Sequence, residues 1–285
     1  MKDLTVFVLT HNRKELLLET IQSILHQTCH DFKFIVSDNS SDNETTKLLT
    51  ENNLLDKFEY RKRNKEYTGS EHLNLCLSEV DTKYFILFHD DDIMLPNMVE
   101  RLYSVINGSD YAAVGCNAYY FINSRVTNRQ TLKTNKDMVL SSPSVLVKQY
   151  CNRSIIPFPA YIYNKNKIGD VIFQDTCGKY GDVHWLIELN DKNKLKWLGK
   201  PNMYYRIHLG QDSQTTQFTD MSKLLRLFKK YCSQSLVINR YRCYILYAKW
   251  IKEKQSRYNF YRKLTVLSRH SKLLALKFFI RMIFK

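Results

Sequence analysis

Three consecutive carboxylates, Asp90, Asp91 and Asp92, follow the apolar run of residues 84–88 after a single intervening histidine. Carboxylates crowded at the end of a buried strand repel one another unless a positive charge compensates them. A divalent cation is such a charge, and oxygen ligands suit Mg²⁺ or Mn²⁺. The alternative is an acidic start to the helix around Pro96, where the helix dipole favours negative charge. The apolar strand favours the metal site, and strand alternation would put Asp90 and Asp92 on one side.

A cation at this position suits chemistry on a diphosphate. A divalent metal can bridge the two phosphates of a nucleotide-sugar and stabilise the diphosphate that leaves as the sugar departs. The cluster therefore predicts Mn²⁺ or Mg²⁺ as cofactor, at a site that suits a diphosphate such as that of a nucleotide-sugar. Transfer to a hydroxyl also needs a general base, and a further carboxylate can take that proton.

Strand and helix patterns alternate through the first third of the chain. Short apolar runs predict buried strands at residues 4–10, 32–37, 57–60 and 84–88. The segments between them carry helical patterns, the clearest over about residues 13–27. This alternation implies right-handed crossovers and a mainly parallel sheet flanked by helices, which is an α/β fold.

Polar clusters stand at the carboxyl ends of three of these strands, at residues 10–13, 38–40 and 89–92. Ligands of open α/β sheets bind in the crevice outside the carboxyl ends of the strands. We therefore expect the three clusters to converge on one binding site. Further along, we expect a helix around residues 182–189 and separate strands near 196–198 and 203–207.

The formal net charge of +15 is carried by the C-terminal region. Residues 221–285 hold 17 of the 43 Lys and Arg residues but one of the 28 acidic residues, Glu253. This region therefore carries +16, and residues 1–220 carry −1. The asymmetry predicts a near-neutral enzyme domain, residues 1–215, followed by a basic helical extension, residues 216–285, that meets an anionic surface.

The end of the extension combines charge with apolar surface. Lys272, Lys277, Arg281 and Lys285 follow at spacings of five, four and four in a segment otherwise rich in Leu, Ile and Phe. This pattern is typical of a helix at a membrane interface, with its basic residues near anionic head groups. The alternatives are a helix docked on the enzyme's own core and, less favoured, a nucleic-acid surface.

No part of the sequence predicts membrane insertion or export. It has no run of eighteen uncharged apolar residues, and its start lacks a signal-peptide layout. We therefore expect a cytoplasmic protein that is peripheral at the inner face of the cell membrane.

Five motifs, taken together, resemble those of the family 2 glycosyltransferases. In chain order they are LTHNR at 9–13 with SILHQT at 23–28, DNSSD at 38–42, FHDDD at 88–92 with Pro96, YGDVHWL at 180–186, and YYRIH at 204–208 with Ser213. The resemblance spans roughly residues 3–215. It implies a GT-A fold and an inverting, metal-dependent enzyme of the bacterial surface-polysaccharide type.

The resemblance also implies roles on the donor side. Thr10, Asn12 and Arg13 would border the nucleotide base and phosphates, and Asp38 would accept a hydrogen bond from the imide N–H of uracil or thymine. Asn74 is carried over to the donor site, although Leu73 stands where many relatives have Arg. Asp90 and Asp92 would be the D-x-D pair that touches the ribose and the metal. Many relatives carry Asp where His89 stands, so Asp91 is an alternative to Asp90.

On the acceptor side, the resemblance makes Asp182 the general base, with capping of the following helix as the alternative role. Arg206 would contact the donor, and His208 would ligate the metal or contact the diphosphate. We therefore expect the enzyme to transfer a sugar from a nucleotide-sugar, specifically a UDP-sugar, to a saccharide acceptor. The basic extension is consistent with an acceptor that is linked to a lipid. The alternatives are a metal-dependent sugar nucleotidyltransferase, although residues 5–20 contain no Gly for a phosphate loop, and a nonenzymatic nucleotide-binding module.

Overall fold

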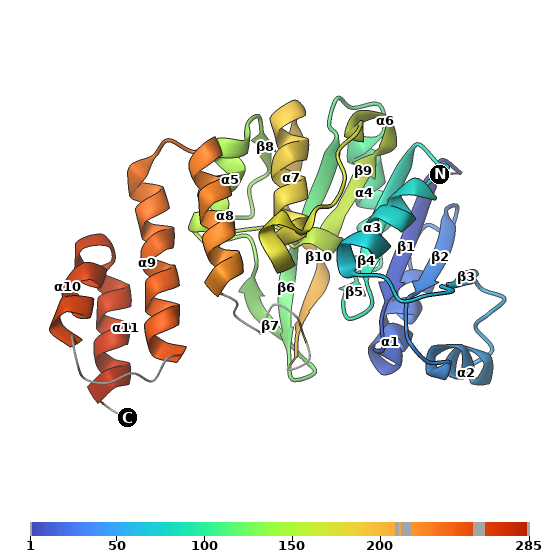
Figure 1. The fold of residues 1–285 in the computed structure, drawn as a ribbon. Coiled ribbons are helices and arrows are strands. Elements are labelled where there is room, and N and C mark those ends of the chain that lie inside the picture. The colour runs from blue at the N-terminus through green and yellow to red at the C-terminus, as the bar shows by residue number, and fades with distance from the viewer. Residues whose placement is uncertain (1, 209–210, 212–217, 253–259, 284–285) are drawn as a thin grey trace.

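The protein folds around one twisted sheet of ten strands with helices on both sides (Figure 1). This computed structural model describes residues 2–208, 211, 218–252 and 260–283. The strands follow the order β3-β2-β1-β4-β9-β6-β10-β5, with β7 paired to β6 and β8 to β10. The predicted α/β fold with a central sheet is confirmed.

The N-terminal half of the sheet is parallel, as the alternation of patterns predicted. Strands β1, β2, β3 and β4 pair in parallel through β1·β2, β1·β4 and β2·β3. Helices α1, α2 and α3 connect them in turn. The elements are β1 (Leu4–Thr10), α1 (Lys14–Leu25), β2 (Lys33–Asp38), α2 (Glu44–Glu51), β3 (Glu59–Lys62), α3 (Gly69–Ser78) and β4 (Tyr84–His89).

The second half of the sheet mixes directions. Antiparallel β9 lies between β4 and β6, and β6 pairs in parallel with β10. The elements are β5 (Ile93–Met94), α4 (Met98–Ile106), β6 (Ala113–Ile122), β7 (Arg125–Gln130), β8 (Met138–Leu140), α5 (Pro143–Cys151), β9 (Tyr161–Asn164), α6 (Lys165–Ile168), α7 (Gly181–Lys192) and β10 (Leu195–Ile207), with 3₁₀ turns η1 (Phe158–Ala160) and η2 (Asp175–Tyr180).

The expectation of two strands after α7 was wrong. One long strand, β10, covers both segments, and its register against β6 shifts on either side of Pro201. Proline cannot donate a ladder hydrogen bond, so the irregularity falls where the sequence suggested a break.

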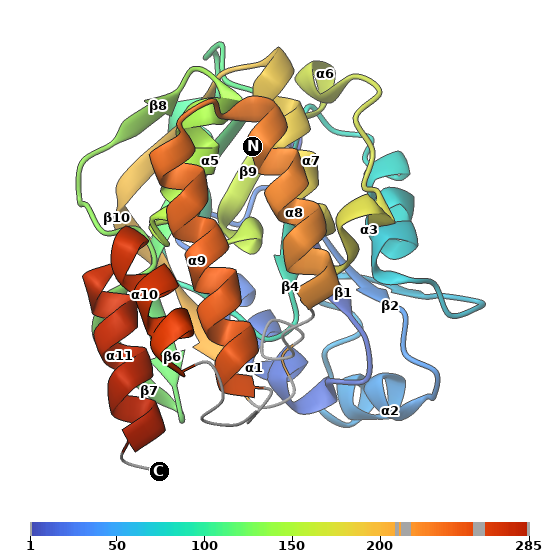
Figure 2. The same ribbon diagram turned by 60° about the vertical axis from the view of Figure 1, so that its left-hand side comes forward.

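Four helices form the extension: α8 (Phe218–Tyr231), α9 (Ser235–Lys252), α10 (Phe260–His270) and α11 (Lys272–Ile283). Helices α8 and α9 add Leu224, Phe228 and Tyr241 to the main hydrophobic core. Helices α10 and α11 instead pack on α9 in a second cluster built on Leu267 and Phe278. The main core therefore continues past residue 215, and the α10–α11 pair lies at the outer end of the molecule (Figures 1 and 2).

In the part of the chain that the structure describes, the helices are all too short or too polar to cross a membrane.

Candidate active site

The carboxyl ends of β1, β2 and β4 meet at one edge of the sheet (Figure 1). In the parallel registers Thr10 pairs with Asp38, and Leu9 pairs with His89. The polar clusters at residues 10–13, 38–40 and 89–92 therefore lie beside one another. The structure brings them together as the strand alternation predicted, and this edge is the candidate active site.

Asp90 faces the end of β1. Its carboxylate accepts hydrogen bonds from the Thr10 hydroxyl at 2.8 Å, the His11 backbone N–H at 3.2 Å and an Arg13 guanidinium N–H at 3.2 Å. Arg13 also lies 3.5 Å from the Asp91 carboxylate. These contacts join the first and third clusters directly and leave Arg13 at the boundary between them.

The chain turns immediately after β4, so strand alternation does not extend through the three carboxylates. β4 ends at His89, and Asp90 and Asp91 form a turn. Asp90 and Asp92 were expected on one side only if the strand geometry persisted, and it does not: Asp90 faces β1, whereas Asp92 accepts a 2.9 Å hydrogen bond from the Arg206 backbone N–H of β10. The buried Thr20 hydroxyl fixes the turn, because it lies 2.9 Å from the Asp90 carbonyl oxygen and 2.7 Å from that of Asp92.

A group able to hold a metal ion forms on the other side of this turn. His89, Asp91 and Asp92 each place a ligand atom within 4.8 Å of the others. His208 lies beside the group, with its Nε2 3.0 Å from the Asp91 carboxylate. Sequence reasoning missed His89, although its place at the head of the carboxylate run was a signal that could have included it. Asp90, by contrast, is not among these three.

The residues present fit a divalent cation. Oδ2 of Asp92 is buried and has no hydrogen-bond partner among the described residues. Burial, together with the neighbouring Asp91 carboxylate, raises the pKa of Asp92 well above its ordinary value. Burial and Asp91 also raise the pKa of Asp90. A cation bound here would supply the missing partner and offset the repulsion that makes these carboxylates reluctant to ionise.

Arg206 is a support for the carboxylate turn. Its Nε donates to the Asp91 carbonyl oxygen at 2.7 Å, and its guanidinium pairs with Glu19 of α1 at 2.6 Å. The guanidinium also lies over the Phe121 ring, 4.6 Å from the centroid. The side chain is buried, so its donors are directed at protein groups. Ser213, the last residue of the same motif, lies outside the described residues.

Asp38 is buried at the end of β2 with both oxygens engaged. Oδ1 accepts from the Ser40 backbone N–H at 2.8 Å, and Oδ2 accepts from the Tyr60 hydroxyl at 2.6 Å and from Lys62 Nζ at 3.3 Å. Lys62 and Tyr60 come from β3 and were not predicted from sequence. Asn12, with a left-handed φ of 54°, ties this region to β1, because its backbone N–H donates to the Ser40 hydroxyl at 2.9 Å.

Asp182 lies in the first turn of α7. The N-cap position belongs to Tyr180, so Asp182 is not the capping residue. Its carboxylate accepts from the Val183 backbone N–H at 2.8 Å, and burial raises its pKa to about 6. Tyrosine side chains surround it: burial first, and the Asp182 charge in addition, raise the pKa of Tyr180 to about 12 and that of Tyr150 well above its ordinary value.

The segment that leads into Asp182 is held from α3. The Asn74 side-chain amide donates to the Phe173 carbonyl oxygen at 2.9 Å and accepts from the Phe173 backbone N–H at 2.8 Å. The Ser70 hydroxyl donates to Asp175 at 2.5 Å. The Asn74 side chain therefore uses these hydrogen bonds to position the segment that precedes α7. This role differs from the donor-side role that the resemblance implied.

The same segment is also held from α8. The Asp220 carboxylate is buried and accepts from the Lys179 backbone N–H at 3.3 Å. It lies against Gly178, where φ is +58° and an added Cβ would come 2.3 Å from the Asp220 Cγ. Glycine is therefore required here both by its backbone conformation and by the close carboxylate. No sequence signal pointed to Asp220, because the contact joins segments 41 residues apart.

The fold and this edge together define an α/β protein of the GT-A type, with a carboxylate cluster where the parallel strands end. Residues 5–175 match the family model described as "Glycosyl transferase family 2". That match covers more than half of the chain, which therefore belongs to this family. A relative from Haemophilus influenzae (strain ATCC 51907 / DSM 11121 / KW20 / Rd), named "Uncharacterized glycosyltransferase", is 31% identical over 108 residues, which is 38% of this chain and 33% of the relative. The match thus spans about a third of that relative's length.

Solved structures share the fold. The structure of S. aureus TarS 1-349 in complex with UDP-GlcNAc superposes with a TM-score of 0.63 at 14% identity, covering 96% of this chain and 83% of that one. The structure of S. aureus TarS 1-349 in complex with UDP gives a TM-score of 0.59 at 15% identity, covering 94% of this chain and 79% of that one. At this identity the likeness is one of fold.

Proposed function

We propose that this protein transfers a sugar from a UDP-sugar to a saccharide acceptor. The observation that carries the proposal is the carboxylate turn at the sheet edge, where a buried Asp92 oxygen has no hydrogen-bond partner among the described residues. Membership of glycosyl transferase family 2 supports sugar transfer as the chemistry of that site. The UDP-GlcNAc complex of the similarly folded S. aureus TarS supports a uridine nucleotide as the donor.

On the donor side, Thr10, Asn12 and Arg13 would border the nucleotide. Arg13 lies between Asp90 and Asp91, and its guanidinium would meet the phosphates. Asp38 would receive the imide N–H of the base. Because its Oδ2 already accepts from Tyr60 and Lys62, those two residues would set the orientation of its carboxylate. The contact predicted between Arg206 and the donor would be indirect, through the turn that Arg206 supports.

Mn²⁺ or Mg²⁺ would be held by Asp92 together with Asp91 and His89, and His208, beside Asp91, would be a further ligand. Asp90 remains a candidate ligand from the side of β1. When bound, the metal would neutralise charge that develops on the departing diphosphate. The protein's own part is to hold the carboxylates in place, and Thr20 and Arg206 do this through the turn's backbone.

Asp182 would act as the general base of a single inverting displacement. Its carboxylate would take the proton from the acceptor hydroxyl as that oxygen attacks the anomeric carbon. A pKa of about 6 leaves most of the group ionised at neutral pH and makes it a stronger base than an ordinary carboxylate. The hydrogen bonds that Ser70, Asn74 and Asp220 make to the preceding segment would hold Asp182 at the acceptor side.

The acceptor would be a saccharide on a lipid carrier in surface-polysaccharide synthesis, with the enzyme at the cytoplasmic face of the membrane. The excess of 17 basic residues over one acidic residue in 221–285 supports a location beside anionic lipid.

A panel of nucleotide-sugars tests the donor assignment. Thermal unfolding would be followed with UDP-, dTDP- and GDP-sugars, with and without Mn²⁺, together with release of the nucleoside diphosphate. We expect UDP-sugars to raise the Tm when Mn²⁺ is present and to be slowly hydrolysed. If no nucleotide-sugar raised the Tm or was hydrolysed, the proposed transfer would be wrong.

A further inference from the structure

Helix α11 has one face buried against its neighbours. Ala275 and Phe278 pack into the cluster that joins α9, α10 and α11. The Phe278 ring lies 5.8 Å from that of Phe260 and 6.1 Å from that of Trp250. These contacts fix the rotation of α11 and so determine which of its residues face outward.

The outward face of α11 is apolar. Leu273, Leu276 and Ile280 are 61%, 55% and 44% exposed, and Phe279 is 38% exposed. Spacings of three and four residues place the first three on one stripe of the helix. They and Phe279 make up four of the nine large hydrophobic side chains that are exposed in the described structure. The other five are dispersed over the rest of the fold, so α11 carries a concentrated patch that the described residues leave uncovered.

Basic residues flank this patch, and acidic ones do not. Lys272 and Lys277 are exposed on the same helix, on either side of the stripe. Arg269 and Arg242 are exposed on the neighbouring helices α10 and α9. The described residues of α9, α10 and α11 include no Asp or Glu. Lys285 and the side chain of Arg281 lie outside the described structure.

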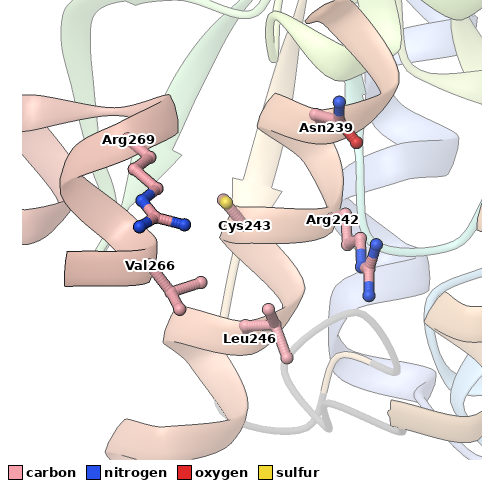
Figure 3. A pocket seen from close by; sticks show the side chains of 6 residues that line it. All are labelled: Asn239, Arg242, Cys243, Leu246, Val266 and Arg269. Atoms are coloured by element: carbon pink, nitrogen blue, oxygen red, sulfur yellow. The ribbon is translucent and has the colours of Figure 1, made fainter. Parts of the chain in front are cut away.

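The groove between α9 and α10 is lined by two basic residues, Arg242 and Arg269 (Figure 3). Its cavity of about 190 Å³ is smaller than the pockets that usually hold a ligand the size of a nucleotide-sugar. Figure 3 shows Arg242 and Arg269 on opposite sides of the groove, with Cys243 and Val266 between the helices. The two arginines therefore do not converge on one small anion, and the groove is not a ligand site of its own.

We propose that the outward face of α11 docks on an anionic lipid bilayer. Leu273, Leu276 and Ile280 would enter the boundary between head groups and acyl chains, and Lys272 and Lys277 would lie among anionic head groups. A second copy of this chain would bring two strongly basic surfaces together, and a nucleic acid would leave the apolar stripe exposed. An anionic bilayer offers both negative head groups for the lysines and an apolar interior for the exposed stripe. The inference rests on the membrane location proposed above and names the surface that binds; its test needs no transfer reaction.

Vesicle binding by the full chain tests this surface. Co-sedimentation would compare vesicles of phosphatidylcholine with vesicles that also contain phosphatidylglycerol, at low and high salt. We expect binding to the anionic vesicles, part of which survives high salt because apolar burial is not screened, and weak binding to the neutral ones. Equal binding to both vesicle types would overturn the proposal.

Two variants assign the binding to α11. Leu273→Ser/Leu276→Ser/Ile280→Ser removes the stripe from exposed positions and should lower partitioning by about tenfold or more. The matched control is Leu236→Ser, which alters a 60% exposed leucine at the start of α9 and should bind as the parent does. An unchanged Tm would show that both variants fold.

Unchanged vesicle binding by the triple variant would place the membrane contact elsewhere and refute the assignment to α11. A concentration-dependent dimer that the triple variant loses would show that a second copy covers this face, and would equally refute it. Because the assay contains no donor, its outcome is separate from that of the nucleotide-sugar panel.

Discussion

Replacement of Asp182 by Asn separates the general base from the rest of the site. The amide keeps the size of the side chain and its oxygen can still accept from the Val183 N–H, but it cannot take a proton. We expect donor binding to persist while transfer falls by about 10²-fold or more, the usual scale for a general base. Glu188→Gln is the matched control, since Glu188 is a carboxylate of the same helix that pairs with His184 at 3.2 Å.

The raised pKa of Asp182 allows a second test, which is the dependence of transfer on pH. With a pKa of about 6, Asp182 is ionised to about nine tenths at pH 7 but only about one tenth at pH 5. Transfer by the parent should therefore fall about tenfold between these pH values, whereas an ordinary aspartate would lose very little. Donor affinity measured at both pH values separates this effect from titration at the carboxylate turn. Near-normal turnover by Asp182→Asn, or a variant that keeps the same pH profile, would refute the assignment and point to Asp175 or Glu188.

Three further predictions follow from the structure. Asp92→Asn should abolish the rise in Tm that donor and Mn²⁺ produce together, and a retained Mn²⁺ effect would refute the metal site. The Tm without metal should not fall, because the raised pKa of Asp92 means that its ionisation lowers the stability of the fold as the pH rises. Asp220→Ala should lower turnover by roughly tenfold to a hundredfold with donor affinity unchanged, whereas Asp220→Asn, which keeps an acceptor for Lys179, should lose less; equal losses would contradict the clamp. Deletion of residues 270–285 should lower vesicle binding and activity on a lipid-linked acceptor but spare donor hydrolysis, and unfolding of the catalytic core would count against it.

The parallel half of the fold could be predicted because its signals are local. Each short apolar run forms a strand, and polar residues follow three of the runs at the carboxyl edge. The parallel topology then requires these clusters to meet, as the register of Thr10 with Asp38 shows. No long-range contact had to be known for that inference, only the handedness of the crossovers.

The orientation of the carboxylates could not be predicted in the same way. Alternation applies while a strand continues, but β4 ends one residue before Asp90. The turn that replaces it is fixed by Thr20 from α1 and by Arg206 from β10, both far away in the sequence. The position of Asn74 depends likewise on Phe173, 99 residues further along. Roles set by such tertiary contacts leave no periodic trace in the sequence.

In the C-terminal extension, the high content of basic residues predicted one region, although its helices differ in how they pack. Basic residues occur throughout residues 221–285, so charge marks a single region. Burial divides it, because Leu224 and Phe228 of α8 complete the main core while Leu273 and Leu276 of α11 remain exposed. Lysine and arginine can cover either kind of helix, since their long stems pack on apolar surface while their charges stay in water. The distinction therefore lies in the apolar side chains: those of α8 already have a partner in the catalytic domain, and those on the outer face of α11 must find one elsewhere.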